Sequence, residues 1–267
     1  MSARERDLRE ELITREPAEA LAGLLDIDMP AGPLPPLWHW VYLLDRPAQA
    51  ALGPDGHPSS GIPAPPGPGM KRMFAGGRVE THHLLEYGPP AVRTTYVSAT
   101  RKKAGRSGRL TFVTVRSEYA QGGRLRIVDE SDIVYRTAGS SVAVRVGSVE
   151  QRPEKVDGPA LRLTADEAFL FRFSALTYNA HRIHYDQRWV VQEGYGDLVV
   201  HGPLQALMMG ELLRRTGPGL LGRCLSYRLV APMVGPQTFT VLPSEDGAEV
   251  RDVFGTVTAR CSVSPLG

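Results

Sequence analysis

The sequence predicts an α+β protein built from two sheet-and-helix units. In the first half, four β-rich runs separated by turn residues follow a helical segment, which is typical of a sheet curved around one helix. In the second half, a helix over residues 203–215 precedes three further strand-like runs. We therefore divide the chain into units of residues 1–155 and 156–267, on element order alone, because the halves share no visible residue-level repeat.

The first unit is predicted to begin with helices. Residues 3–25 combine good helix formers with apolar positions, which predicts one or two short helices. Pro35 and Pro36 suit a first helical turn, and the aromatic and aliphatic run behind them predicts a buried helix over 34–45. Residues 52–69 contain too many prolines and glycines for a helix or a strand, so a long loop is expected there.

Four strands are predicted to follow this loop. The runs are rich in β-branched and aromatic residues with partial alternation, and short segments of Gly, Pro and Ser separate them. They cover residues 79–87, 92–102, 109–120 and 125–136.

The second unit follows a polar stretch at 151–159, which is interpreted as a linker. Asp166 and Glu167 stand at a plausible helix start within the segment 165–186. The predicted helix over 203–215 has a proline at its start and two arginines at its end. Three strands are expected after it, at residues 223–232, 237–244 and 250–263.

Composition excludes several classes of protein. The 31 basic and 29 acidic residues give a net charge of +2, which argues against a dedicated nucleic-acid binder. Two cysteines, Cys224 and Cys261, cannot form a disulfide framework or a four-thiolate zinc site. The charged start and the absence of a long apolar run predict a cytoplasmic protein with no membrane partner.

Candidate chemistry concentrates in the run TYNAHRIHYD, residues 177–186. It holds two of the seven histidines beside Asn179, Arg182 and Asp186. The polar end of a surface helix is one interpretation. However, the run lies between apolar segments, where plain surface turns are usually rich in Gly or Ser, so a functional cluster is the stronger hypothesis.

Other kinds of site are less well supported. His181 and His184 with His201 or Asp186 have the residue types of a zinc site, but their spacing matches no specific zinc motif, so no metal is predicted. The chain has no G-x-S-x-G elbow and no phosphate-binding loop. The remaining candidates lie in loop or strand contexts and are assigned no catalytic role: Asp55, His57, His82 and His83.

A second cluster is VVHGPL, residues 199–204. Gly202 stands directly before a helix that begins with proline, which leaves a free backbone N–H at the positive end of the helix dipole. This arrangement is suited to an anion or a carbonyl oxygen. The alternative is a simple tight turn from a strand to a helix.

With these clusters, the sequence resembles the MaoC-like double hotdog hydratases and dehydratases, in particular the branch of mesaconyl-CoA hydratases and type 2 hydroxyacyl-thioester dehydratases. TYNAHRIH aligns with the family motif S-G-D-x-N-P-I-H, which places Asn179 at the acidic position and His184 at the histidine. Gly202 falls on the glycine that opens the family's central helix. Segments of the first half also resemble this branch: LPPLWHWVY, LGPDGHP, MFAGGRV, RSGRLTFVTVR and DIVYR.

The resemblance implies two hotdog units, each a curved antiparallel sheet around a central helix. The unit 1–155 would shape the acyl pocket without catalysing, and the unit 156–267 would carry the chemistry. The implied enzyme is a hydro-lyase that hydrates a 2-enoyl thioester or dehydrates a 3-hydroxyacyl thioester, bound to CoA or to an acyl carrier protein. No cofactor is implied, and the protein is expected to be able to form a homodimer.

The resemblance also implies residue roles. His184, with an imidazole pKa near 6.5, suits proton transfer at neutral pH, and the N–H of Gly202 would stabilise an enolate-like oxygen. Asn179 replaces the family's aspartate and cannot act as a base, but its amide can hold the water. Asp186 is therefore kept as the alternative partner of His184.

Three further residues are predicted to bind the substrate: Tyr178, Arg182 and His201. Arg182 would either face a carboxylate of the acyl group or pair with Asp186. Two other functions stay open. One is a carrier-protein-linked dehydratase of a fatty-acid or polyketide pathway, and the other is a catalytically silent hotdog protein that binds acyl thioesters, which the amide at position 179 would suit.

Overall fold

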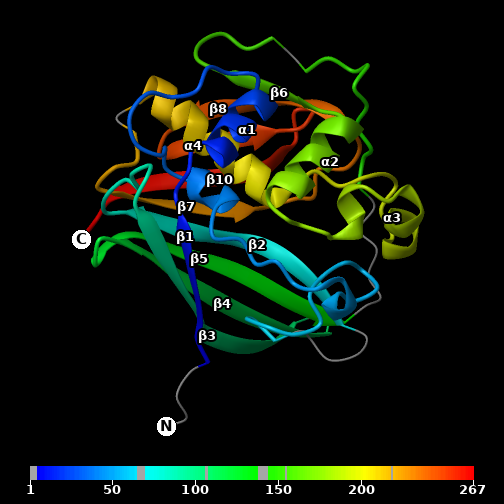
Figure 1. Ribbon diagram of the computed structural model, residues 1–267. Helices are drawn as coiled ribbons and strands as arrows, with labels where there is room; N and C mark the ends of the chain where they lie inside the picture. Colours follow the sequence, from blue (N-terminus) through cyan, green and yellow to red (C-terminus); the bar gives the residue numbers. More distant parts are fainter. Residues whose placement is uncertain (1–4, 65–69, 106–107, 138–143, 154, 218) are drawn as a thin grey trace.

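The structure, a computed structural model, describes residues 5–64, 70–105, 108–137, 144–153, 155–217 and 219–267 (Figure 1). Within these ranges the first half contains β1 (Asp7–Leu12), α1 (Glu16–Leu24), two 3₁₀ turns, η1 (Trp38–Val41) and η2 (Gln49–Ala51), and then β2 (Met70–Thr81), β3 (Pro90–Gly105), β4 (Gly108–Gln121) and β5 (Arg124–Thr137). The second half contains β6 (Leu161–Ala165), α2 (Glu167–Leu176), η3 (Arg182–His184), α3 (Gln187–Glu193), α4 (Gly202–Thr216), β7 (Arg223–Leu229), β8 (Gln237–Ser244), β9 (Gly247–Arg251) and β10 (Val257–Pro265). The predicted α+β class is confirmed.

The ten named strands form one antiparallel sheet in the order β1-β3-β4-β5-β2-β7-β10-β9-β8-β6. The strands of each half are neighbours, and the β2–β7 ladder joins the halves, from Gly76 opposite Arg228 to Thr81 opposite Arg223. A Cβ atom on Gly76 would overlap with the carbonyl oxygen of Tyr227, so glycine is required for the two backbones to come this close. The halves therefore share a single continuous sheet.

The second half packs around α4, which contacts β8, β9 and β10. Residues 204–212 of this helix are all buried. A helix that is buried on nearly every side is expected to be apolar, and the one acidic residue of this stretch, Glu211, is ion-paired with Arg214 and Arg215. The helix predicted over 203–215 is thus confirmed, and it is the core of the second half.

The prediction of a helix over 34–45 is wrong, because the only helical part of this segment is a 3₁₀ turn at Trp38–Val41. Leu37, just before this turn, has a φ of 70°, which a right-handed helix cannot accommodate. The indole N–H of Trp38 instead donates to the Glu211 carboxylate on α4, at 2.9 Å. Within its described residues the first half therefore lacks a long central helix, and the one α-helix there, α1, packs against α2.

Other elements also differ from the prediction. Residues 7–12 form the edge strand β1 because alternate side chains are partly buried and the backbone pairs with β3. The strand predicted at 79–87 is β2 and covers Met70–Thr81. The run 250–263 is two strands, β9 and β10, because Asp252 accepts two backbone hydrogen bonds in the turn between them. The short strand β6, paired with β8, was not predicted.

The two predicted irregular segments contain no helix or long strand in their described residues. Of the loop predicted at 52–69, residues 65–69 lie outside the described ranges, as does residue 154 of the linker predicted at 151–159. Among the helices in the described ranges, none has the length and apolar character needed to cross a membrane.

Candidate active site

A cavity of about 1300 Å³ lies between the sheet of the first half and the segment that joins α2 to α4. Strand β2 lines it from the first half, and residues 177–181 and the start of α4 line it from the second half. Asn179, His184 and Gly202, the three residues predicted to be catalytic, all contribute to this lining. The structure therefore brings both sequence clusters to one site.

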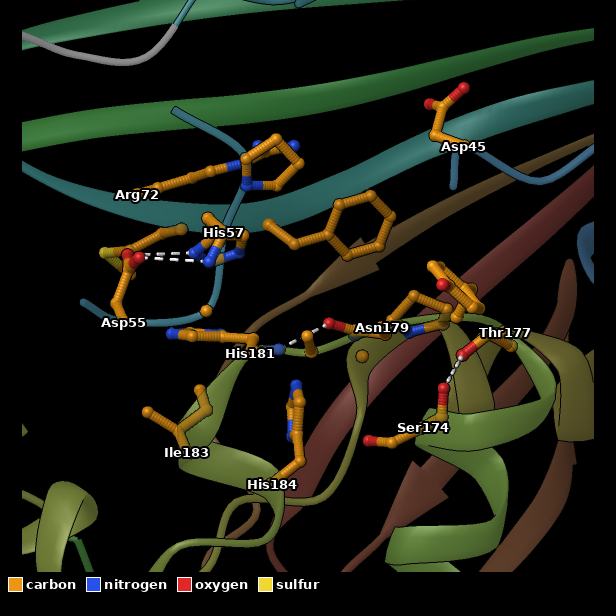
Figure 2. Close-up of a pocket in the computed structure, with 18 of the residues that line it drawn as sticks. Asp45, Asp55, His57, Arg72, Ser174, Thr177, Asn179, His181, Ile183 and His184 are labelled. Carbon is orange, nitrogen blue, oxygen red and sulfur yellow. Dashed lines mark hydrogen bonds and ion pairs between the residues drawn. The ribbon is translucent and has the colours of Figure 1, made fainter. Parts of the chain in front are cut away.

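Asn179 is positioned by the end of α2 (Figure 2). Tyr178 takes a left-handed conformation, with a φ of 52°, and the backbone N–H of Asn179 returns to the carbonyl oxygen of Ser174 at 2.8 Å. The side-chain oxygen of Asn179 accepts a hydrogen bond from the backbone N–H of His181 at 3.0 Å. Among the described residues, the amide nitrogen of Asn179 has no partner, so it is free to donate to an oxygen atom in the cavity.

His184 presents a neutral ring to the cavity. Its Nδ1 lies 2.7 Å from the carbonyl oxygen of Val199, and because a carbonyl only accepts, Nδ1 carries the hydrogen and Nε2 keeps a lone pair. Burial lowers the pKa of His184 to about 4; the hydrogen bond to Val199 opposes this shift, and the nearby His57 adds to it. His184 is therefore neutral at physiological pH and can accept a proton.

His201 lies behind His184 and does not line the cavity. It is fully buried, and its ring stacks on that of His184 with centroids 3.6 Å apart and planes 17° apart. Its Nε2 lies 2.8 Å from the hydroxyl oxygen of Ser174, and burial lowers its pKa well below 6.5. The predicted contact with substrate does not fit this position, and His201 instead supports the ring of His184.

Gly202 is the first residue of α4 and faces the cavity. Within the described ranges its backbone N–H has no hydrogen-bond partner, and it lies at the positive end of the helix dipole. A Cβ atom at this position would overlap with the end of the Leu229 side chain. The absence of a side chain thus leaves the N–H open to an oxygen that gains negative charge.

Tyr178 and Arg182, the other two residues predicted to bind the substrate, differ in their position relative to the cavity. Tyr178 stands at the cavity surface with 52% of its area exposed. Arg182 does not line the cavity, because its guanidinium binds the Asp186 carboxylate at 2.6 Å and the carbonyl oxygen of Pro54 at 2.9 Å. Of the two predicted roles for Arg182, the structure shows the ion pair. Asp186 also caps α3, so it is no partner of His184.

The loop predicted at 52–69 also contributes to the site, a role that the sequence analysis did not assign to it. Gly56 has a φ of 87° and meets the second half so closely that a Cβ atom would overlap with the carbonyl oxygen of Ala180. The backbone N–H of Arg182 donates to the carbonyl oxygen of Asp55 at 2.9 Å. This loop places Asp55 and His57 in the cavity, where His57 Nδ1 lies 3.0 Å from the carboxylate.

The site contains one group of potential metal ligands. Asp55, His57 and His181 have ligand atoms within 4.8 Å of one another. However, His57 already bonds to Asp55, and the rings of His57 and His181 contact each other, with centroids 3.9 Å apart and planes tilted by 38°. This geometry fits a hydrogen-bonded pair in contact with a third ring better than ligands around an ion.

The buried rings should make the protein sensitive to acid. A histidine titrates near pH 6.5 in the unfolded chain, whereas burial lowers the pKa of folded His184 to about 4 and that of His201 well below 6.5. Between about pH 6.5 and 4 the unfolded state binds more protons, so the free energy of unfolding should fall by up to ~1.4 kcal/mol per pH unit for each ring.

Urea unfolding at about pH 7, 6 and 5 measures this slope. The variant His201→Gln lacks one of these rings and should show a shallower pH dependence than the parent. Equal slopes in the parent and in this variant would contradict the assignment of His201 as a buried neutral ring.

Comparisons with known proteins identify the family and agree with this fold. Residues 37–235 match the family described as hydroxyacyl-thioester dehydratase type 2. The chain is 42% identical over 241 residues to mesaconyl-C(4)-CoA hydratase of Chloroflexus aurantiacus, covering 87% of this chain and 85% of the relative.

Solved structures show the same architecture. HtdX of Mycobacterium tuberculosis matches with a TM-score of 0.70 at 14% identity, over 98% of this chain and 100% of that one. Another Mycobacterium tuberculosis protein, described as a double hotdog fold, matches with a TM-score of 0.52 at 13% identity, over 99% and 96% of the two chains. The predicted double hotdog fold is confirmed.

Proposed function

Because the chain belongs to the type 2 hydroxyacyl-thioester dehydratase family, we propose that it is a hydro-lyase that adds water reversibly to the C2–C3 double bond of a 2-enoyl thioester. The reverse reaction removes water from a 3-hydroxyacyl thioester. The observation that carries this proposal is the position of His184 and Gly202 in one cavity, which pairs a neutral base with an oxyanion donor.

Water addition uses each of these groups. His184 Nε2 takes a proton from water while the water oxygen bonds to C3, and the amide of Asn179 holds that oxygen. The electron pair of the double bond moves toward the thioester oxygen, which accepts a hydrogen bond from the N–H of Gly202. C2 then takes a proton, which gives the 3-hydroxyacyl product.

Hydration of crotonyl-CoA and mesaconyl-CoA tests the activity, measured as the loss of absorbance of the conjugated enoyl thioester. We expect turnover of at least one of the two thioesters by the full chain. Binding of both thioesters without turnover would contradict the enzyme and favour the silent acyl-thioester-binding protein.

The carrier is assigned to CoA because the 42% identical relative is named as a CoA hydratase. Equal concentrations of crotonyl-CoA and crotonyl carrier protein compare the two carriers directly. A kcat/KM at least ten times higher on the carrier protein would instead favour the carrier-linked dehydratase. The family resemblance also predicts that the chain can form a homodimer. The molar mass in solution, measured by light scattering, tests this prediction.

The cavity also contains an arginine that favours an acyl group with a free carboxylate. Arg72 on β2 lines the cavity, and no carboxylate within the described ranges forms an ion pair with it (Figure 2). Burial lowers the pKa of Arg72, although Tyr135 and Asp55 oppose this shift. A bound anion would compensate the charge that burial disfavours, and a mesaconyl group carries such a carboxylate.

Replacing Arg72 with glutamine should therefore raise KM for mesaconyl-CoA about 10- to 100-fold, since a charge-assisted hydrogen bond contributes about 1.5–3 kcal/mol. The values for crotonyl-CoA should change little. The control is Arg78→Gln, because Arg78 lies on the same strand, pairs with Glu130 at 3.0 Å and does not line the cavity. Equal losses with both thioesters would contradict a carboxylate site at Arg72.

A further inference from the structure

Hydration requires an acid that protonates C2 as well as a base for the water, and in the second half His184, buried and hydrogen-bonded as a neutral ring, is placed to be the base. Asn179 has no transferable proton, and Asp186 is engaged with Arg182 outside the cavity. We infer that His57, with Asp55 as its partner, donates the proton to C2. This inference rests on the proposed function and gives the first half a catalytic residue, contrary to the sequence-based prediction for residues 1–155.

Asp55 and His57 form a hydrogen-bonded dyad on one tight loop. His57 Nδ1 lies 3.0 Å from one carboxylate oxygen, and the backbone N–H of His57 donates to the other at 3.0 Å. Since Nδ1 faces the carboxylate, Nε2 is the ring nitrogen left for chemistry. The His57 side chain is 23% exposed and lines the cavity.

Asp55 is suited to compensate a positive charge on His57. Burial raises the pKa of Asp55, but the hydrogen bonds from the ring and the backbone of His57 outweigh this and bring it to about 2. The carboxylate is therefore ionised at neutral pH. An ionised carboxylate at Nδ1 stabilises the imidazolium form, in which both ring nitrogens carry a proton.

His57 and His184 occupy opposite environments in the same cavity. His184 donates to a neutral carbonyl and is buried, which favours the neutral ring, whereas His57 faces a carboxylate and keeps contact with solvent. Figure 2 shows His181 between them, with ring centroids 3.9 Å from His57 and 5.5 Å from His184. Two titratable groups whose environments favour opposite protonation states are suited to serve as acid and base.

The dyad is held against the catalytic segment. Gly56, between its two members, touches the backbone at Ala180, and Arg182 binds the loop through its backbone N–H and its guanidinium, both at 2.9 Å. Arg182 is therefore a positioning residue in this proposal. A proton donor fixed by backbone contacts meets the geometric demand of proton transfer to carbon better than a mobile side chain.

With His184 as the base and His57 as the acid, every bond that breaks during hydration is matched by one that forms. The water O–H bond breaks as His184 Nε2 takes the proton, and the C3–O bond forms as the double-bond electrons move to the enolate. The Nε2–H bond of His57 then breaks as C2 takes the proton and the electron pair returns from the enolate to form the C2–H bond. His184 ends protonated and His57 neutral, and one proton passes between them through solvent before the next cycle.

The pH dependence of hydration tests this assignment. The charged and titratable groups around His57 are Asp55 on its own loop, His181 and His184 on the segment after α2, and Arg72 on β2. In the parent, kcat/KM should rise with pH as His184 loses its proton and fall at alkaline pH, where the proton donor to C2 is lost. His57→Gln should lower kcat/KM about 10²- to 10³-fold and remove the alkaline fall.

Asp55→Asn provides the second arm of the test. Asparagine can still accept the hydrogen bond from Nδ1, but it lacks the charge, so the alkaline fall should move to lower pH. The matched control is His82→Gln, because His82 also pairs with a carboxylate of the first half, Glu80 at 3.3 Å, but does not line the cavity. This control should keep both the rate and the profile of the parent.

A His57→Gln variant that keeps the alkaline fall, at whatever rate, would overturn the inference, because a purely structural role lowers the rate without changing the profile. If that variant fails to fold, an unmoved alkaline fall in Asp55→Asn overturns the inference equally. A parent chain without hydratase activity would contradict the proposed function itself, so the two failures are distinguishable.

Discussion

Replacing His184 with asparagine should lower kcat for hydration by about 10³-fold in a protein that keeps its fold. The asparagine amide nitrogen can take the place of Nδ1 and still donate to the carbonyl oxygen of Val199, which lies 2.7 Å from the histidine ring. The substitution therefore removes Nε2 and the stack on His201 while it preserves the hydrogen bond between the two segments.

Crotonyl-CoA hydration and thermal unfolding, measured on the same preparation, separate the two effects of this change. His201→Gln removes only the ring behind His184 and should cost about tenfold or less, since it withdraws support and leaves the base. A folded His184→Asn variant within about tenfold of the parent would assign the base to another residue.

Replacing Gly202 with proline should lower kcat about 10²- to 10³-fold relative to Gly202→Ala. Both substitutions place a Cβ atom against the end of the Leu229 side chain, which can shift, but only proline removes the N–H. Proline is accepted in the first turn of a helix, and His201 before it has a ψ of 129°, which the residue before a proline prefers.

The kcat values of the parent and the two variants decide the role of this N–H. The loss in Gly202→Ala measures the crowding at Leu229, and the additional loss in Gly202→Pro measures the missing donor. Equal losses in both variants would show that the enolate oxygen is stabilised by another group.

Local signals account for the parts of the fold that could be predicted. The strands within 92–136 carry β-rich runs between turn residues, and α4 carries a proline at its start and arginines at its end. The helix prediction for residues 34–45 failed because the aromatic side chains of this segment are buried through long-range contacts. The hydrogen bond from Trp38 reaches Glu211, 173 residues away, and no local pattern contains that information.

The same distinction applies to the site. Asn179, His184 and Gly202 could be predicted because each lies in a short polar motif next to a helix end. The loop of Asp55 and His57 was predicted, but the place of these two residues in the cavity could not be, because it depends on tertiary contacts such as that between Gly56 and Ala180. Likewise, the sequence predicted that His201 binds the substrate, because the sequence does not show that its ring is buried and stacked on that of His184.

The β2–β7 ladder joins residues roughly 150 positions apart, and this separation matters while the chain is being synthesised. At about 5–20 residues per second, β7 leaves the ribosome on the order of ten to thirty seconds after β2. During that time the β2 edge has no partner, yet it carries two glycines and the charged side chains of Arg78 and Glu80. Glycines and charged side chains disfavour pairing with a strand of another molecule. The residues of β2 that later pair with β7 therefore also reduce aggregation of the nascent first half.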